Sequence, residues 1–512
     1  MNRQPHEPVC VPVVVIGAGP AGVTAATLLG QYGVECLVLD RWDGVYPQPR
    51  AVHLDDEIYR ILDRLGVAAE FAAVSRPTRG LQLIDRDHRV FAVFGRDAEV
   101  GRHGHPQANM FDQPELEEVL RANLKHQPTV TLRGNVEVTD VTQDGQGRVR
   151  VDYTDRLTDQ QDSIHATYVL GCDGANSVIR TAIGSTMEDL RFEQRWLVID
   201  VASTVELDQW DGVHQLCDPD RAATYMRIGE TRYRWEFRLL EGETAADFES
   251  IESLEPLIGP WLRGVPCEQL ELVRVAEYHF RAELADHWRD GNVFLLGDAA
   301  HLTPPFIGQG LCAGLRDAMN LSWKIAGVLS GDLPEAVLDT YEVERKPHAR
   351  ALIRLAKLVG VAMSRGGTAG DVLRKAIAPR LHWIPGLRDR LLDSQTPPLH
   401  RSALVVGPAH RGSLNGQLCP NAVLADGTRY DHLASGQFVL VTAAPLSSRH
   451  RATLAERGAR VVDAQPGSAL ATWLASGRAA AALVRPDHTV MACARDIASL
   501  VDATPSFAPK AA

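Results

Sequence analysis

Three glycines near the start of the chain, Gly17, Gly19 and Gly22, have the spacing of a phosphate-binding turn. Residues 13–16 are apolar and rich in β-branched side chains, which predicts a buried parallel strand before the turn. Residues 23–30 predict a helix after it. In such a unit the first glycine permits the turn, the second lets a pyrophosphate approach the backbone, and the third lets the helix pack on the strand. The helix N-terminus then offers free N–H groups to phosphates.

Asp40 follows the next predicted strand, residues 34–39, at the usual distance beyond the glycines. A carboxylate there accepts hydrogen bonds from the ribose hydroxyls of a dinucleotide. The order of strand, turn, helix, strand and acid favours a dinucleotide site over a glycine turn in another βαβ unit. Arg50 closes the loop after Asp40. It could pair with the pyrophosphate or be an ordinary surface arginine.

The bulk composition limits the classes of protein. With 512 residues the chain has room for roughly three domains. Its net charge of −12 argues against nucleic acid or an anionic membrane as the main partner. No apolar run approaches the roughly 20 residues that cross a bilayer, and no secretion signal is evident. The eight cysteines are scattered without a CxxC pair. We therefore expect a cytoplasmic protein with free thiols and no metal site.

Two later segments repeat the pattern of a buried strand that ends in polar residues. Residues 168–172 lead into Asp173-Gly174, and residues 293–296 lead into Gly297-Asp298. A long helix is predicted over residues 311–328. Between these segments the pattern changes, with strands predicted at 197–201 and over 225–239. We expect an inserted antiparallel sheet with one face turned to a cavity.

These separated motifs together resemble the group A flavin aromatic hydroxylases, which have the para-hydroxybenzoate hydroxylase fold. The motifs are the glycine turn, Asp173-Gly174 followed by Arg180, and the run Gly297–Gly310. Within that family, residues 49–51, 55–57 and 217–219 are most similar to the 3-(3-hydroxyphenyl)propionate hydroxylases. The resemblance covers the whole chain and is thinnest after about residue 400. There the order of elements is similar to the thioredoxin-like tail of the phenol hydroxylase branch.

The resemblance implies an α/β fold: a Rossmann-like FAD-binding domain, an inserted antiparallel-sheet substrate domain and a C-terminal thioredoxin-like domain without CxxC. The FAD-binding domain would comprise residues 1–76, 105–185 and 281–360. The substrate domain would comprise residues 77–104 and 186–280, followed by a helical connector at 361–400 and the C-terminal domain at 401–512.

The resemblance also implies FAD as the cofactor, with NADH or NADPH as a transient co-substrate that has no second Rossmann unit. The residues expected to bind FAD are Gly17, Gly19, Pro20, Ala21, Gly22, Asp40, Arg41, Arg50, Ala51, Gln113, Asp173, Gly297, Asp298, Pro305, Gly308, Gln309, Gly310, Leu311 and Cys312. One residue departs from the family pattern, because many relatives have Asn at the position of Cys312. A thiol is a poor hydrogen-bond donor, so the local flavin geometry would be shaped differently here.

The implied reaction is hydroxylation of a phenol by a flavin hydroperoxide formed from reduced FAD and O2. Ortho-hydroxylation of a 3-(3-hydroxyphenyl)propionate-like acid is the leading hypothesis. The alternatives are a tailoring hydroxylase of a larger aromatic natural product, a flavin reductase or oxidase that does not hydroxylate, and a flavoprotein used mainly for assembly. A homodimer is possible.

The residues that act on the phenol are not fixed by the motifs. His214, Tyr225 and His301 are candidates for the base that activates it, although each could be structural. The candidate substrate contacts are Tyr225, Arg227, Trp235 and Pro305. A substrate carboxylate would call for an arginine, and Arg195, Arg227 and Arg234 lie in the inserted sheet. Most such arginines are solvated, and most such aromatic side chains belong to the core.

Overall fold

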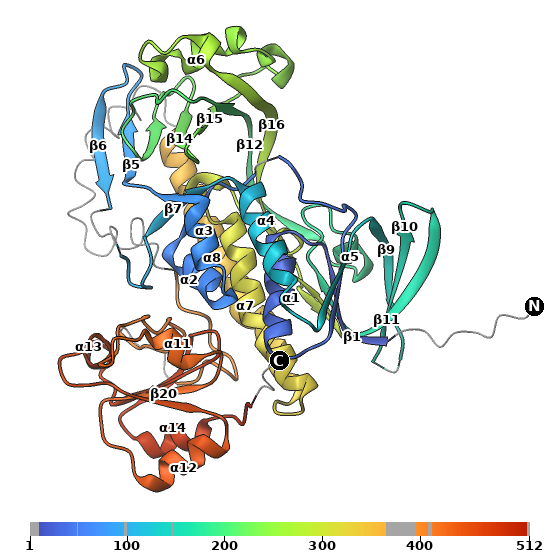
Figure 1. The fold of residues 1–512 in the computed structure, drawn as a ribbon, viewed down its shortest axis with the longest axis vertical. Coiled ribbons are helices and arrows are strands. Elements are labelled where there is room, and N and C mark those ends of the chain that lie inside the picture. Colours follow the sequence, from blue (N-terminus) through green and yellow to red (C-terminus); the bar gives the residue numbers. More distant parts are fainter. Residues whose placement is uncertain are drawn as a thin grey trace, which may run out of the picture.

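The computed structural model describes residues 10–48, 50–96, 100–145, 147–364, 396–407 and 412–508. Figure 1 shows a central body of helices and strands, a second sheet at one end of it and a separate C-terminal body. The mixed α/β class expected from the sequence is confirmed. Most of the helical connector predicted over residues 361–400 lies outside the described residues.

The central sheet has a parallel core flanked by antiparallel additions. Its strands are β1 (Cys10–Ile16), β2 (Cys36–Leu39), β8 (Val130–Arg133), β9 (Val136–Gln143), β10 (Val149–Asp155), β11 (Gln160–Gly171), β17 (Arg289–Asp290) and β18 (Val293–Leu295). β1 lies between β11 and β2 and is parallel to both. Residues 13–16 are fully or almost fully buried, as their apolar run predicts. The motif-bearing ends of β1, β11 and β18 therefore meet at one edge of the sheet.

Helices from distant parts of the chain pack on this sheet or on one another beside it. They are α1 (Pro20–Gln31), α2 (Asp56–Leu65), α3 (Ala68–Ala73), α4 (Gln113–Leu124), α5 (Val178–Ala182), α7 (Gly310–Leu329) and α8 (Thr340–Ser364). α1 and α7 run side by side through the middle of the molecule (Figure 1). Most of α7 is buried, so this long helix forms part of the core rather than a surface layer.

The second sheet combines two separated segments, residues 80–95 and 187–302. Its strands are β5 (Gly80–Ile84), β6 (Val90–Gly95), β12 (Met187–Ala202), β13 (Val213–Leu216), β14 (Ala223–Arg227), β15 (Arg232–Arg238), β16 (Glu271–Ala285) and β19 (His301–Leu302). The prediction of one strand over residues 225–239 is wrong. The chain turns back after Ile228, whose N–H donates to the carbonyl of Arg232 (3.0 Å), and Gly229 lies in that turn. Two antiparallel strands result, with Tyr225 opposite Trp235.

The two faces of this sheet differ in chemistry, because successive side chains on a strand point to opposite sides. The outer face is apolar and packs on α6 (Ile251–Leu262), a helix that the sequence analysis did not predict. Trp235 on this face is fully buried and shares a core with Ile258 and Trp261. The inner face carries the alternate residues of β15, among them Arg234 and Glu236.

A small sheet joins the two larger bodies, and a third sheet forms the C-terminal body. The small sheet contains β3 (His53–Asp55), β4 (Ser75–Pro77) and β7 (Ala108–Phe111). The C-terminal elements are α11 (Tyr430–Ala434), β20 (Val439–Thr442), α12 (Ser448–Glu456), β21 (Arg460–Asp463), α13 (Ala469–Ser476), β22 (Ala481–Val484), β23 (Val490–Ala494) and α14 (Ile497–Ala503). The sheet order is β21-β20-β22-β23. The likeness of this body to thioredoxin remains a prediction.

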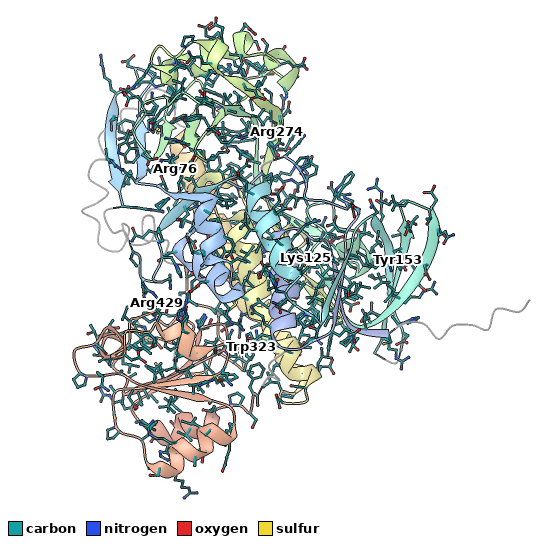
Figure 2. All side chains as sticks on the ribbon, viewed as in Figure 1. Arg76, Lys125, Tyr153, Arg274, Trp323 and Arg429 are labelled. Carbon is teal, nitrogen blue, oxygen red and sulfur yellow. The ribbon has the colours of Figure 1, made fainter. Side chains whose placement is uncertain are left out.

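The C-terminal body packs on the end of α7 through aromatic side chains. Trp323 of α7 meets Phe438 and Phe507 edge to face, with ring centroids 5.6 and 5.9 Å apart. Trp323 lies between the two bodies (Figure 2). Among the described residues, no helix is both long and apolar enough to cross a membrane. All eight cysteines are free thiols.

Candidate functional site

Each glycine of the β1–α1 turn has a different neighbourhood. A Cβ on Gly17 would lie 2.4 Å from the carbonyl oxygen of Cys172, and Gly17 has a φ of +100°. A Cβ on Gly22 would lie 2.0 Å from the carbonyl oxygen of Gly17. A Cβ on Gly19 would meet no atom within 4 Å. The protein itself thus requires glycine at positions 17 and 22, while the space beside Gly19 leaves room for a ligand close to the backbone.

Two helix N-termini without side-chain caps meet at this place. α1 begins after Gly19 with Pro20, and α7 begins after Gln309 with Gly310; neither has a side-chain cap or an acidic residue in its first turn. A Cβ on Gly314 of α7 would lie only 3.2 Å from the Cβ of Ala21. The free N–H groups and positive dipole ends of both helices favour an anionic ligand such as a diphosphate.

The Gly297-Asp298 motif lies against the same turn, in the short 3-10 segment η3 (Gly297–Ala299). Gly297 has a φ of +61°, and a Cβ there would lie 3.3 Å from the Cβ of Ala21. Asp298 is exposed, yet enough protein surrounds it for desolvation to raise its pKa, while the charges of His301 and Arg50 lower it. Segments almost 300 residues apart in the sequence therefore form one site.

Asp40 lies at the end of β2, where the sequence analysis placed it, and its carboxylate orders the turn. The carboxylate accepts hydrogen bonds from the N–H groups of Ala18 (2.6 Å) and Trp42 (2.8 Å). Arg121 of α4, which the sequence analysis did not identify, approaches to 3.8 Å and also donates to the carbonyl of Ala18. Arg41 is exposed, with its guanidinium 5.8 Å from the ring centre of Trp42.

The loop that ends at Arg50 is fixed through its backbone. The N–H of Ala51 donates to the Gln113 side chain (2.6 Å), and Gln113 in turn donates to Glu117 (2.6 Å). The Arg50 guanidinium is exposed and stacks on Tyr46, 4.6 Å from its ring centre. The charge of Arg50 lowers the pKa of Asp298, as expected of a cation on the same side of the site.

Asp173 contributes to the site through the loop that it stabilises. Its carboxylate accepts the Ser177 hydroxyl (2.6 Å) and the Ile179 N–H (3.2 Å) at the start of α5. Burial raises its pKa, and these hydrogen bonds lower it. The backbone of this segment packs against Gly17. Arg180 donates to the carbonyls of Ala175 and Ala299, so it ties α5 to η3.

The glycine-rich segment before α7 is held from behind by a buried ion network. Gln309 donates to Asp55 (2.9 Å) and accepts from Arg316 (2.7 Å). Arg316 also pairs with Asp55 (2.8 Å) and with Glu57 (2.8 Å). The Gln309 side chain therefore anchors the loop, and backbone groups of residues 308–310 remain for the ligand. Gly308 has a φ of +62°, and a Cβ there would collide with His53.

Cys312, where the family resemblance leads us to expect Asn, lies in the first turn of α7 and is buried. Its thiol lies 3.4 Å from the carbonyl oxygen of Gly308, within range of a weak hydrogen bond. Burial raises the pKa of this thiol strongly, so it stays protonated. Cys312 supports the loop rather than offering a thiolate. Leu311 and Gly310 beside it are partly accessible.

His301 is placed beneath the site and not in a position to meet a phenol. Its side chain is fully buried, and Nε2 lies 2.7 Å from Oδ2 of Asp317. Asp317 also accepts the N–H of Gly297 (3.0 Å) and pairs with Arg345 (2.9 Å). Burial raises the pKa of Asp317, and the charges of His301 and Arg345 outweigh that effect and lower it. His301 therefore orients η3, and this placement argues against its role as the phenol base.

The other base and substrate candidates of the inserted sheet lie on its outer face. Tyr225 and Trp235 are buried in the core against α6. His214 contacts Tyr225, and its Nε2 lies 3.0 Å from the carbonyl oxygen of Trp210. Arg227 pairs with Glu206 (2.7 Å) on the same side. The prediction that these residues touch the substrate is not supported, because the aromatic stripe of the sheet is core and the alternate residues face inward.

The inner face carries a buried ion pair at the boundary with the cofactor loop. Arg234 of β15 binds Asp200 of β12 through Nε (2.6 Å) and Nη2 (2.9 Å). Its Nη1 donates to the carbonyl of Arg50 (2.8 Å). Arg234 was a candidate for a substrate carboxylate, but the structure gives its donors to the protein itself.

Glu236 also lies on this face, and sequence analysis missed it. Its side chain is 13% exposed, and Nη1 of Arg234 lies 4.0 Å from its carboxylate. Burial raises the pKa of Glu236, the Arg234 charge lowers it, and Asp200 raises it again. Period-two alternation with the buried Trp235 would have identified it, because residues 234 and 236 must face the side opposite to residue 235.

Pro305 begins η4 (Pro305–Ile307), which joins the cofactor loop to the inner face. Phe306 packs against Trp196 of β12, with ring centroids 5.8 Å apart, and Trp196 stacks on Phe280 of β16 (5.6 Å). Pro305 is half-buried, as expected of a residue at the wall between the two domains. The inner face and the α7 N-terminus therefore border one region.

Comparison with known proteins shows the family to which the chain with this site belongs. Residues 10–356 match the family model described as the FAD binding domain. The chain belongs to this FAD-binding family. The match spans all three segments that build the glycine turn, η3 and α7. FAD is therefore the anionic cofactor for which the two uncapped helix N-termini are suited.

Curated relatives of this family member are hydroxylases by name. The chain is 33% identical to the "Probable NADH-specific resorcinol 4-hydroxylase" of Rhodococcus jostii, over 96% of this chain and 93% of that protein. It is 32% identical to the "3-(3-hydroxy-phenyl)propionate/3-hydroxycinnamic acid hydroxylase 2" of Burkholderia vietnamiensis, over 97% and 96%. The relationship to the flavin-dependent hydroxylases expected from the sequence motifs is confirmed.

Solved structures show the same fold over nearly the full chain. The rebeccamycin biosynthetic enzyme RebC with reduced flavin has a TM-score of 0.79 at 24% identity, covering 98% of this chain and 100% of that one. The flavin-dependent monooxygenase PieE in complex with FAD and substrate has a TM-score of 0.79 at 22% identity, covering 97% and 98%. At this level of identity the likeness establishes the fold.

Proposed function

We propose that this protein is an FAD-dependent monooxygenase that hydroxylates a phenol with NADH or NADPH and O2. The observation that carries the proposal is the convergence of the glycine turn, η3 and the uncapped N-terminus of α7 beside the inner face of the inserted sheet. FAD, when bound, supplies the chemistry that passes electrons from NAD(P)H to O2 and inserts one oxygen atom into an aromatic ring.

The residues of this chain would divide the binding of FAD between the two helix N-termini. The turn at Gly19 and the first N–H groups of α1 would receive the pyrophosphate, and Asp40 would lie near the adenosine ribose. Asp298 and Arg50 would lie along the middle of the cofactor. Backbone N–H groups of residues 308–311 would contact the flavin ring. The network around Arg316 would hold that last segment still.

The substrate would lie beside η4 and the inner face, where the aromatic side chains of Phe306 and Trp196 would keep water from the reacting ring. Such exclusion protects a reactive oxygenating species from wasteful decay. Glu236 is a carboxylate on this face with a raised pKa, and among the described residues the only cation that approaches it is Arg234, at 4.0 Å. In its ionised form it would accept the proton or hydrogen bond of the phenol hydroxyl.

Two substrate classes follow from this face, and they differ in charge. Arg234 is engaged by Asp200 and the Arg50 carbonyl, and Glu236 adds negative charge, which favours a neutral phenol such as resorcinol. A 3-hydroxyphenyl acid would need another cation. Arg232 on the same strand is half-buried, and its charge acts on Asp112. It is the residue that would receive a substrate carboxylate.

The test uses the purified, FAD-loaded chain. We expect a yellow protein whose NADH oxidation accelerates with resorcinol or with 3-(3-hydroxyphenyl)propionate and yields a product heavier by one oxygen atom. Arg232→Leu should raise the KM for the acid substantially and leave resorcinol turnover nearly unchanged. Stimulated oxidation that forms only H2O2 with both compounds would point to a larger aromatic substrate. Absence of stimulation by any phenol would overturn the proposal in favour of a reductase or oxidase.

A further inference from the structure

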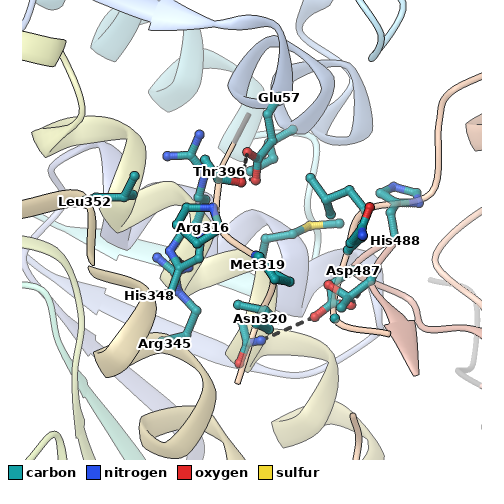
Figure 3. A pocket seen from close by; sticks show the side chains of 18 of the residues that line it. Glu57, Arg316, Met319, Asn320, Arg345, His348, Leu352, Thr396, Asp487 and His488 are labelled. Carbon is teal, nitrogen blue, oxygen red and sulfur yellow. Dashed lines mark hydrogen bonds and ion pairs between the residues drawn. The ribbon is translucent and has the colours of Figure 1, made fainter. Parts of the chain in front are cut away.

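A cavity of about 530 Å³ lies where α2, α7 and α8 meet the C-terminal body (Figure 3). It is lined on one side by residues such as Glu57, Arg316 and His348, and on the other by Asp487 and His488. Its volume is in the range of sites that bind small molecules. The cavity is neither the FAD site nor the phenol site, because neither the glycine turn nor the inner sheet face contributes to its wall.

Most of the charged groups around this cavity already have partners. Arg60 pairs with Asp431 of the C-terminal body, where its Nε lies 2.6 Å from Oδ2. Arg345 pairs with Asp317 (2.9 Å). Arg102 is exposed to solvent at the rim of the cavity, and no hydrogen bond or ion pair fixes its guanidinium within the described part of the chain. Desolvation lowers its pKa, although it remains a cation at neutral pH. The Asp56 carboxylate acts on the Arg102 charge without forming an ion pair, so this guanidinium can turn toward an anion in the cavity.

A second polar group also lacks a hydrogen bond. His488, in the turn between β22 and β23, is 4% exposed, and neither ring nitrogen has a hydrogen-bond partner. Its Nδ1 lies 3.6 Å from Asp431, which is too long for a hydrogen bond. Burial and the charge of Arg60 lower its pKa to about 4, so the ring is neutral and has one N–H to donate. Buried polar groups without partners are costly unless a ligand or water satisfies them.

Part of the remaining wall is apolar. Ile61 of α2, Met319 of α7, and Leu352 and Leu355 of α8 all line the cavity. Met319 and Leu352 face the same space as His348 and His488 (Figure 3). A ligand that matches both walls has one negative charge and an apolar body, which is the chemistry of a small organic carboxylate.

We propose that this interdomain cavity is a second ligand site, which takes a small organic carboxylate between Arg102 and His488 with its apolar part against α7 and α8. The site communicates with the flavin loop through Arg316. That guanidinium lines the cavity and donates to Gln309 and Asp55, which hold the segment before α7. A ligand in the cavity therefore changes the environment of a residue that positions the FAD site.

The experiment is a calorimetric titration of the FAD-loaded full chain with 3-phenylpropionate, which has a carboxylate but no ring hydroxyl. No NADH is present, so the result does not depend on whether the chain hydroxylates phenols. We expect Arg102→Gln to bind one carboxylate fewer per chain than the wild type, or to bind it at least about tenfold more weakly. The control Arg449→Gln removes an exposed arginine of the C-terminal body and should match the wild type.

A second variant fills the cavity instead of removing its charge. Ala351 is half-buried on α8 and lines the cavity, so Ala351→Phe should cause the same loss of one ligand. A melting curve confirms that each variant is folded. Equal stoichiometry and affinity in the wild type, Arg102→Gln and Ala351→Phe would overturn the proposal. Any change in the flavin absorbance that accompanies the second binding event should vanish in the same two variants, and its persistence in them would refute the coupling through Arg316.

Discussion

The FAD-binding turn and the inserted sheet are built in opposite ways. In the turn, the ligand site is made of backbone, and side chains are excluded from it: Gly17 and Gly22 leave no room for a Cβ, and Gly19 leaves space open. In the sheet, the backbone is regular, and the side chains that face inward form the site. Arg234 and Glu236 lie on the inner face, and Arg234 reaches the cofactor loop, while Trp235 between them is core.

This difference explains why a single residue type identifies one region and not the other. Glycines at this fixed spacing have few structural roles, so the turn can be recognised from the sequence alone. An aromatic or an arginine in a strand has many uses, and only the face that it occupies distinguishes a pocket wall from core. Each of the following predictions compares the two regions, or the two faces of the sheet.

The largest effect is expected from Arg234→Met on the inner face. Both Arg234 and Asp200 have side chains that are at most 2% exposed, so the substitution leaves a buried carboxylate unpaired. Loss of one partner of such a pair costs about 3–5 kcal/mol of unfolding free energy. Chemical denaturation measures it. The matched control is Arg227→Met on the outer face, whose partner Glu206 is 73% exposed and whose loss should cost less than about 1 kcal/mol.

Similar costs for the two arginine variants would contradict the assignment of the faces. A large cost for both would place Arg227 in a desolvated site. A small cost for both would mean that the contact of Arg234 with Asp200 and the Arg50 carbonyl adds little to the fold.

The next effect compares two glycines within the turn. Gly22→Ala places a Cβ 2.0 Å from the carbonyl of Gly17 and should cost about 1–3 kcal/mol of stability, because helix α1 must move away from β1. Gly19→Ala meets no protein atom within 4 Å, so it should leave the melting temperature of the FAD-free protein nearly unchanged. We expect it to weaken FAD binding by at least about tenfold, measured by flavin fluorescence.

An undiminished affinity for FAD in Gly19→Ala would show that the cofactor does not approach the turn at this residue. Loss of stability in the same variant, with FAD absent, would show that the open space beside Gly19 is needed by the protein itself.

The sequence predicted the region made of backbone well. The strand of residues 13–16, Asp40 at the end of β2 and the long helix after Gly310 are all present, because burial periodicity and glycine spacing are local signals. The inserted sheet was predicted as antiparallel, but its turn at Gly229 and the covering helix α6 were not. The aromatic residues are core because helix α6 covers their face of the sheet. Packing between segments that are distant in the sequence leaves no local pattern from which to predict it.

Local sequence patterns also could not predict the ion networks behind the site. Arg316 pairs with Asp55, about 260 residues earlier in the chain, and His301 is fixed by Asp317 and Arg345. The sequence offered His301 as a candidate base or a structural residue and could not choose between the two. Its role as a buried anchor follows only from partners that the fold brings together.

A smaller effect is expected from Glu236→Gln, which keeps the shape of the inner face and removes its titration. Burial is the largest influence on the pKa of Glu236 and raises it. Below that pKa the carboxyl group is protonated and cannot accept the phenol proton, so kcat/KM of the wild type should fall as the pH decreases through it. Glu236→Gln should lower kcat/KM by about 10²-fold at the optimum and remove this acidic limb. An unchanged pH profile would exclude Glu236 as the acceptor. Glu206→Gln, on the outer face, is the control.

The smallest effect is expected from Tyr225→Phe, and its smallness is what makes it informative. Tyr225 packs against Trp235 and Trp261 on the outer face, and burial raises the pKa of its hydroxyl far above neutral pH. Phenylalanine keeps the ring and its contacts, so stability should change by less than about 0.5 kcal/mol and kcat by less than about twofold. Steady-state kinetics with a coupled product assay measures the second quantity. A tenfold loss of kcat with unchanged stability would mean that the Tyr225 hydroxyl reaches the reacting phenol, and the two faces of the sheet would then have to exchange their roles.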